Sequence, residues 1–189
     1  MRVVIAEDEA LIRMDLREML EEDGHEVVGE ARDGAEAIAV ARAVRPDLVF
    51  MDVKMPNVDG IEAARTITAE SIAPGVMVTA FSQSRLVEDA AKAGAMAYVV
   101  KPFSRNDLLP AMQVAASRFA EMALLERQVD DLTERLETRK ALDRAKGILM
   151  AGGMSEPEAF GRLQRLAMDK RKSLREVAEA VITAEELKG

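Results

Sequence analysis

The chain of 189 residues contains no cysteine and no tryptophan, and only 3% of its residues are aromatic. Without cysteine it can form neither a disulfide nor a thiolate metal site, which is typical of a protein in a reducing compartment. Because 49% of the residues are hydrophobic, a packed core can form, but it must be built from Val, Ile, Leu, Ala and Met. These absences exclude a disulfide-rich scaffold and favour an ordinary globular protein.

Long apolar runs are absent as well. No run approaches the roughly 18 residues that a transmembrane helix requires. The first residues become acidic at Glu7 and Asp8, so the start of the chain does not resemble a secretory signal peptide. We therefore expect a soluble cytoplasmic protein without a membrane partner.

Negative charge dominates the chain, which has a formal net charge of -8, but the two signs are unevenly distributed. From Thr138 to Gly189 there are 11 Lys and Arg residues and 8 Asp and Glu residues, which gives +3 and leaves -11 for the preceding part. An acidic front and a basic tail predict two domains with different partners.

Five short apolar segments predict β-strands, and turn residues or helical spacing follow each of them. The expected strands are Arg2–Ala6, His25–Ala31, Leu48–Asp52, Gly75–Thr79 and Ala97–Val100. The expected helices cover Leu11–Leu20, Asp33–Ala43, Gly60–Ala69 and Ser84–Ala93, and Ser104 with Asp107 opens a fifth. Five such β-α units predict an α/β fold with a flavodoxin-like, doubly wound, five-stranded parallel sheet.

No strand pattern follows Val100, so we expect an all-α tail. Its first apolar residues step by three and four, as in a coiled-coil seam that continues the fifth helix: Met122, Leu125, Val129, Leu132 and Leu136. Three short amphipathic helices follow and predict a three-helix bundle. The first ends at Gly152, and the other two begin at Ser155 and Ser173, each with a glutamate three residues later.

The strand ends carry the most distinctive chemistry. Glu7 and Asp8 follow the first strand, Asp52 ends the third, Thr79 ends the fourth, and Lys101 follows the fifth. In an open α/β sheet, ligands bind just beyond the carboxyl ends of the strands. Clustered carboxylates repel one another unless a cation neutralises them, and oxygen ligands suit Mg²⁺. A carboxylate beside such an ion can form an aspartyl-phosphate, with an ammonium and a hydroxyl group stabilising the phosphoryl oxygens.

Residues 1 to about 117 resemble the receiver domain of two-component response regulators. The matching residues are Glu7-Asp8, the string MDVKMPNVDG from Met51 to Gly60, Thr79-Ala80 and Lys101-Pro102-Phe103. The resemblance implies that a sensor histidine kinase phosphorylates Asp52. The implied Mg²⁺ site consists of Asp8, Asp52 and the backbone carbonyl of Lys54 as ligands, with Glu7 supporting it.

The same resemblance assigns three further residues. Thr79 and Lys101 would bind the phosphoryl oxygens, and the Lys101-Pro102 peptide would be cis. Tyr98 occupies the place of an aromatic residue whose rotamer reports phosphorylation in the family. An ordinary half-buried strand tyrosine remains the alternative for Tyr98, and His25 is expected on the surface without a catalytic role.

From about Leu124 the chain resembles an ANTAR domain, the RNA-binding output module of antitermination regulators. The matching segments are Ala145–Met150, Ser155–Phe160, Leu163–Met168 and Leu174–Ala178. The two resemblances together imply a receiver domain over residues 1–117, a coiled-coil linker helix over 118–137 and an ANTAR domain over 138–189.

Basic residues of the tail are the candidates for RNA contact, and an ordinary solvated face is the alternative for each of them. The candidates are Arg139, Lys140, Arg144, Lys146, Arg165, Lys170, Arg171 and Lys172, with Arg162 and Arg175 in the same cluster. Such a cluster in an otherwise acidic chain favours binding to a polyanion. Phe160 is expected in the core, so recognition would depend on shape and backbone charge. DNA is disfavoured because no helix-turn-helix pattern is present.

The leading hypothesis is a phosphorylation-controlled transcription antiterminator that binds hairpin RNA and is not an enzyme in the usual sense. Its seam over residues 122–136 would form a homodimer on phosphorylation, although the seam could instead pack against the same chain. The alternative hypothesis is a protein-interaction switch whose helical tail docks on a partner protein.

Overall fold

The computed structural model describes residues 1–80 and 95–187. Its strands are β1 (Arg2–Ala6), β2 (Glu26–Ala31), β3 (Leu48–Asp52), β4 (Gly75–Thr79) and β5 (Ala97–Val100). All pair in parallel in the order β2-β1-β3-β4-β5, the doubly wound arrangement that the sequence predicts. β2 begins one residue later than predicted, because the backbone N–H of His25 still donates to the Leu20 carbonyl in the turn after the first helix.

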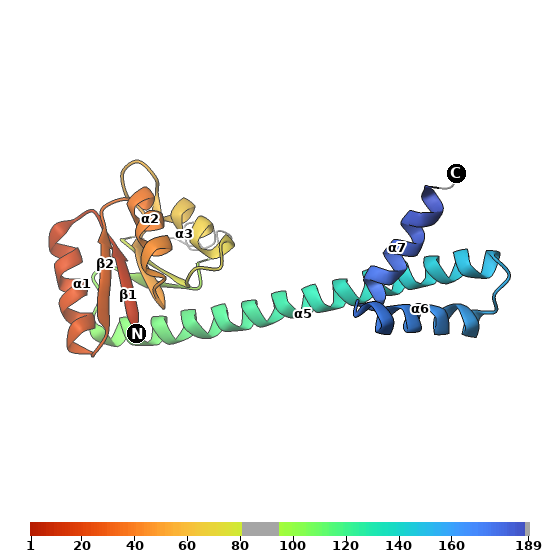
Figure 1. Ribbon diagram of the computed structural model, residues 1–189. Helices are drawn as coiled ribbons and strands as arrows, with labels where there is room; N and C mark the ends of the chain where they lie inside the picture. The colour runs from red at the N-terminus through yellow and green to blue at the C-terminus, as the bar shows by residue number, and fades with distance from the viewer. Residues whose placement is uncertain (81–94, 188–189) are drawn as a thin grey trace. The chain divides into compact units, whose positions relative to one another are not determined.

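The helices follow the strands in the expected order (Figure 1). Three of them, α1 (Ala10–Glu22), α2 (Gly34–Val44) and α3 (Gly60–Ala69), lie where helical spacing predicts them. The helix expected over Ser84–Ala93 lies outside the described residues. After β5 come α5 (Arg105–Ala151), α6 (Glu156–Lys170) and α7 (Leu174–Glu186). No helix in the described parts of the chain is long and apolar enough to cross a membrane.

The chain divides into two compact units, Met1–Leu124 and Leu125–Gly189. In the N-terminal unit, successive strand residues alternate between the two faces of the sheet. Val4 and Val49 pack in one core with residues of α2 and α3, whereas Val3 and Phe50 pack in the other with residues of α1 and α5. Both faces of the sheet are therefore covered, which is why the strands are apolar almost throughout.

The start of α5 is fixed by Ser104 and Asp107, as the sequence predicts. The Asp107 carboxylate accepts hydrogen bonds from the Ser104 backbone N–H at 2.8 Å and from its hydroxyl at 2.6 Å. The first turns of α5 then contribute Leu108, Ala111, Met112 and Ala115 to the core of the N-terminal unit. The predicted seam continues the same helix, and its members Leu125, Val129, Leu132 and Leu136 are each at least 52% exposed.

The C-terminal unit has a small core made largely of small residues: Ala145, Leu163, Ala167, Val177 and Ala178. Ser155 with Glu158 and Ser173 with Glu176 form the predicted capping boxes of α6 and α7. The first of the three predicted tail helices is not a separate element but the last part of α5. The reason is that no glycine or proline interrupts the chain between the seam and Ala145.

Candidate functional site

The predicted strand-end residues meet at one edge of the sheet. Glu7 and Asp8 follow β1, Asp52 ends β3, Thr79 ends β4, and Lys101 follows β5. Because β1, β3, β4 and β5 are neighbours in the sheet, their carboxyl ends lie side by side. The strand order reverses between β1 and β3, which is the place where doubly wound sheets bind their ligands.

Lys101 joins the two buried carboxylates of this edge. Its Nζ lies 2.7 Å from Oε2 of Glu7 and 3.2 Å from Oδ1 of Asp52. Glu7 is 1% exposed and Asp52 8% exposed, so these charges are largely removed from water. The backbone N–H of Lys101 also donates to the Thr79 carbonyl at 2.7 Å, and the Lys101-Pro102 peptide is cis as predicted. One ammonium therefore serves two carboxylates across three strands.

The pKa values show that this ammonium does not fully compensate the acids. Burial raises the pKa of Glu7 above its ordinary value against the hydrogen bond from Lys101, and the charge of Asp52 adds to the rise. Burial likewise raises the pKa of Asp52 although Lys101 opposes it. Burial lowers the pKa of Lys101, but its hydrogen bond to Glu7 and the charge of Asp52 outweigh burial and raise it. The site is short of positive charge.

A divalent cation would supply the missing charge, and the donor set fits one. Glu7, Asp8 and Asp52 each offer a carboxylate oxygen, and these oxygens lie within 4.8 Å of one another. Such an oxygen cluster suits Mg²⁺, which needs few protein ligands and keeps several waters. Lys54 lies two residues beyond Asp52 in the loop before α3, and the role of its carbonyl stays a prediction.

The loop between Asp52 and α3 is held by its own backbone. The Gly60 N–H donates to the Val53 carbonyl at 3.1 Å, and a Cβ on Gly60 would lie 1.9 Å from the Asp52 carbonyl oxygen. Asn57 adopts a left-handed conformation at φ 61°, and its side-chain amide donates to Asp33 at 2.8 Å. The backbone of this loop thus explains why the MDVKMPNVDG string has glycine at position 60 and asparagine at position 57. The sequence alone did not reveal either requirement.

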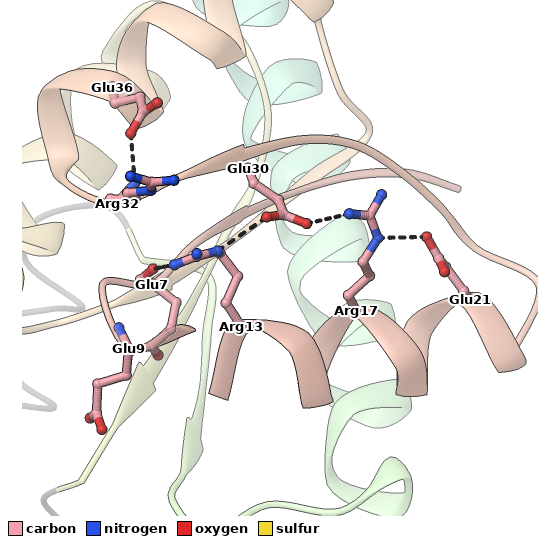
Figure 2. A network of polar contacts seen from close by, with 8 residues as sticks. All are labelled: Glu7, Glu9, Arg13, Arg17, Glu21, Glu30, Arg32 and Glu36. Carbon is pink, nitrogen blue, oxygen red and sulfur yellow. Dashed lines mark hydrogen bonds and ion pairs between the residues drawn. The ribbon is translucent and has the colours of Figure 1, made fainter. Parts of the chain in front are cut away.

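Arg13 of α1 anchors the acidic loop from the other side (Figure 2). Its Nη1 donates to the Glu7 backbone carbonyl at 2.6 Å, and its Nε donates to Glu30 of β2 at 3.1 Å. The Glu9 backbone N–H donates back to the Glu7 carboxylate at 3.3 Å. Arg17 continues the network by pairing with both Glu30 and Glu21. The segment that presents Asp8 is therefore tied to α1 and β2. Sequence reasoning missed Arg13 because no local pattern marks its contacts with the Glu7 carbonyl and with Glu30.

The two residues predicted to respond to phosphorylation lie in different surroundings. Thr79 is 3% exposed at the end of β4, next to the Lys101 backbone. Tyr98 lies on β5 and is 51% exposed, more than the half-buried alternative expects. Its role as a reporter of phosphorylation stays a prediction.

The structure separates the basic candidates of the C-terminal unit into two groups. Five of them lie within ion-pair distance of an acid: Arg139, Lys140, Arg144, Lys146 and Lys172. The remaining candidates, Arg165, Lys170 and Arg171, and also Arg162, form no ion pair with any described residue. All four belong to α6 or cap its end. The basic candidates that form no ion pair with a described residue are thus gathered on one helix, α6, and its C-cap.

Of two minor expectations, the one for Phe160 is wrong and the one for His25 holds only in part. Phe160 is 37% exposed and lies outside the core cluster, because it falls beside the buried face of α6 that Ala159 and Leu163 occupy. His25 is partly buried, and its Nε2 is enclosed without a hydrogen-bond partner among the described residues. Burial and the nearby chain terminus lower the pKa of His25, which suits a neutral structural residue.

Both parts of the chain match known protein families. A family model described as the response regulator receiver domain matches residues 3–113, and one described as the ANTAR domain matches residues 130–182. The transcriptional regulatory protein PdtaR of Mycobacterium tuberculosis is 60% identical over 182 residues, which cover 96% of this chain and 89% of PdtaR. The chemotaxis protein CheY of Bacillus subtilis is 40% identical over 112 residues, which cover 59% of this chain and 93% of CheY.

Solved structures resemble the N-terminal part. The signal receiver domain of NarL from Mycobacterium tuberculosis has a TM-score of 0.59 at 30% identity, covering 61% of this chain and 95% of that one. CheY of Borrelia burgdorferi, solved with CheX, BeF₃ and Mg²⁺, has a TM-score of 0.56 at 28% identity, covering 62% of this chain and 88% of that one. With a receiver fold at its start, an ANTAR match after it and a relative alike along nearly its whole length, this chain belongs to the response regulators that join a receiver domain to an ANTAR domain.

Proposed function

We propose that this response regulator is phosphorylated on Asp52 by a sensor histidine kinase and then acts as an antiterminator by binding hairpin RNA. The observation that carries the proposal is the bridge from Lys101 to Glu7 and Asp52, beside a third carboxylate on Asp8. A buried nucleophile, a cluster of metal ligands and an ammonium at one edge of a sheet are the parts that phosphoryl transfer to a carboxylate requires.

In this proposal each side chain has a distinct task. Bound Mg²⁺ supplies positive charge to the phosphoryl oxygens, with Asp8, Asp52 and the Lys54 carbonyl as its ligands. Glu7 supports the site, since one of its oxygens already accepts from Lys101 and the other from the Glu9 N–H. The Asp52 carboxylate attacks the phosphorus of the kinase's phosphohistidine, so that an O–P bond forms as the P–N bond breaks and the histidine leaves. The Lys101 ammonium and the Thr79 hydroxyl stabilise the phosphoryl oxygens. The Borrelia CheY solved with BeF₃ and Mg²⁺ supports the same use of the site.

Helix α5 is the element that would carry the signal. It contributes Leu108 and Met112 to the core of the N-terminal unit and Ala145 to that of the C-terminal unit. A phosphoryl group on Asp52 adds charge that draws Thr79 and Lys101 toward it and reorders the loops before α5. The exposed seam over residues 122–136 would then pair two copies of the chain. The division into residues 1–117, 118–137 and 138–189 belongs to this proposal.

RNA is the proposed target of the C-terminal unit. The ANTAR match supports it, and so does the unpaired positive charge on α6, because phosphate contacts supply most of the affinity for nucleic acids. Paired C-terminal units would hold two hairpins, disfavour a terminator structure and allow transcription to continue. The printed name of PdtaR, a transcriptional regulatory protein, agrees with this role.

A protein-docking tail is the second candidate, and the exposed apolar seam favours it. Leu132 is 63% exposed and Leu136 is 52% exposed, so a partner helix could cover them instead of a second copy. Such binding would be nearly insensitive to salt, whereas RNA binding would weaken steeply as salt rises.

The deciding experiment is a gel shift with synthetic tandem-hairpin RNAs that have randomised loops, compared with a DNA duplex of the same length. Each is tested with and without acetyl phosphate and Mg²⁺. We expect RNA-selective binding that strengthens on phosphorylation. Absence of RNA binding in both states would refute the RNA role and leave the protein-docking tail.

A further inference from the structure

The outward surface of α6 carries positive charge that its own unit does not neutralise. Residues 156–172 contain five Lys and Arg residues and three acids, of which Glu156 pairs with Lys146 and Glu158 caps the helix through Ser155, leaving Asp169. Lys172 pairs with Glu176 at 3.2 Å, but Arg162, Arg165, Lys170 and Arg171 have no ion-pair partner among the described residues. No described residue lies within ion-pair distance of these four cations, and solvent ions or a bound polyanion can supply the counter-charge.

No contact among the described residues explains why residue 161, inside this helix, is a glycine. A Cβ added to Gly161 would meet no atom within 4 Å, so no packing requires its absence. Its φ is not positive, so the backbone does not require glycine either. Glycine is nevertheless less favourable than alanine in a helix interior, because it loses more conformational freedom on folding. What glycine offers where its Cβ direction faces open space is close access to the helix backbone for another molecule.

Three residues of α6 form one stripe. Gly161, Arg165 and Met168 follow one another at i, i+4 and i+7, so they lie on the same face of the helix. Met168 is 78% exposed and can adapt to a contacting surface. Arg162 lies next to this Gly161 stripe, and Arg171 caps the end of the helix. Two cations that form no ion pair with a described residue, Arg162 and Arg165, thus flank Gly161 along the helix.

We propose that the Gly161 stripe is where the sugar–phosphate backbone of RNA comes closest to the C-terminal unit. Gly161 leaves room for a ribose, Arg165 and Arg162 bind the phosphates beside it, and Met168 contacts the exposed face of a sugar or base. This inference rests on the proposed RNA-binding function. A second copy of the chain is a poorer occupant, because two such stripes would repel each other.

The test is Gly161→Ala in the full-length protein, with melting temperature and RNA affinity measured on the same sample. Alanine should raise the melting temperature of the C-terminal unit. It should also weaken binding to the tandem-hairpin RNA by at least about fivefold, the lower range of what an intruding methyl group costs at a packed contact. If Gly161 only served the fold, alanine would change the melting temperature and the RNA affinity in the same direction, both up or both down.

Thr183→Ala on α7 is the matched control. Thr183 is exposed and its hydroxyl bonds only within its own helix, to the Glu179 carbonyl at 2.9 Å. Alanine there should also favour the helix but leave RNA affinity unchanged. Arg165→Gln should lower the slope of log affinity against log salt by about one, as expected for one lost phosphate contact.

The outcomes separate this inference from the function on which it rests. If the unaltered protein binds no RNA, the proposed function fails and the inference fails with it. If the unaltered protein binds RNA and Gly161→Ala binds equally well, only the inference is overturned. A Gly161→Ala protein that melts at a lower temperature would also overturn it, because Gly161 would then have a role inside the fold.

Discussion

The two units of this protein use charged side chains in opposite ways. In the N-terminal unit, Glu7, Asp52 and Lys101 are buried together at one edge of a sheet, where each depends on the position of the others. In the C-terminal unit, Arg162 and Arg165 lie on the surface of a helix and form no ion pair within the part of the chain that the structure describes. A buried charged site is sensitive to small displacements, whereas a surface field depends mainly on the number and sign of its charges.

The hydrophobic cores of the two units also differ. The N-terminal unit buries clusters of 15 and 14 hydrophobic residues on the two faces of its sheet, while the cluster of the C-terminal unit has five, three of them alanines. Small side chains let helices approach but bury little apolar area, so the C-terminal unit gains less from burial. We therefore expect the N-terminal unit to tolerate conditions that already open the C-terminal unit.

Removing the proposed nucleophile should have the largest effect. Asp52→Asn keeps the shape of the side chain but removes the carboxylate, so labelling by acetyl phosphate should be abolished. The control is Asp59→Asn in the same loop, where asparagine can still cap α3 and labelling should persist. Phosphate incorporation and intact mass would measure both, and labelling retained by Asp52→Asn would contradict the assignment.

A methyl group at Gly60 should disrupt the same unit through its backbone. Gly60→Ala places a Cβ against the Asp52 carbonyl, which cannot move away without displacing the Asp52 side chain. We expect a loss of at least about 2 kcal/mol in the free energy of unfolding. Gly75→Ala, whose Cβ would meet its nearest atom at 3.8 Å, should cost far less. Urea denaturation of both variants tests the difference, and equal costs would contradict it.

Truncating one core residue of the C-terminal unit should separate the stabilities of the two units. Leu163→Ala removes the largest fully buried side chain of that unit and should cost about 2–5 kcal/mol. Hydrogen exchange should then show residues of α6 and α7 unprotected while β1, β3 and β4 stay protected. Acetyl phosphate labelling of Asp52 should remain normal. Simultaneous loss of protection in both units would show that they unfold as one.

Loosening the acidic loop should weaken the metal site without unfolding the receiver. Arg13→Met removes the contacts to the Glu7 carbonyl and to Glu30, so Asp8 is held less firmly. Loss of an outer partner of this kind typically lowers metal affinity by about tenfold to hundredfold. Calorimetric Mg²⁺ titration would measure it, with Arg17→Met as the control that leaves Arg13 in place. Equal affinity in both variants would rule out the positioning role of Arg13.

Acid should have a milder effect on the same site. Burial raises the pKa of both Glu7 and Asp52, so protons compete with Mg²⁺ at a higher pH than they would for exposed carboxylates. Mg²⁺ affinity should therefore be fully present above these raised pKa values and should fall as the pH decreases through them. In the C-terminal unit, RNA binding through arginines should stay nearly constant over the same range. A Mg²⁺ affinity that does not change with pH would contradict the pKa directions.

The sequence by itself determined the order of elements, most strand bounds and the receiver site. Each depends on a local pattern: apolar runs that end at a carboxylate, helical spacing, and the capping pairs at Ser155 and Ser173. Parallel strands bring their carboxyl ends together, so Asp8, Asp52 and Lys101 could be placed near one another without coordinates.

Tertiary structure alone decided what depends on contacts between distant residues. Arg13 reaches Glu30, Gly60 lies against the Asp52 carbonyl, and Phe160 is exposed although its neighbours Ala159 and Leu163 are buried. Charge composition marked the tail as basic, but only the positions of the acids show which cations are neutralised. Ion pairs depend on distances of a few ångströms between side chains, and no local pattern in the sequence specifies those distances.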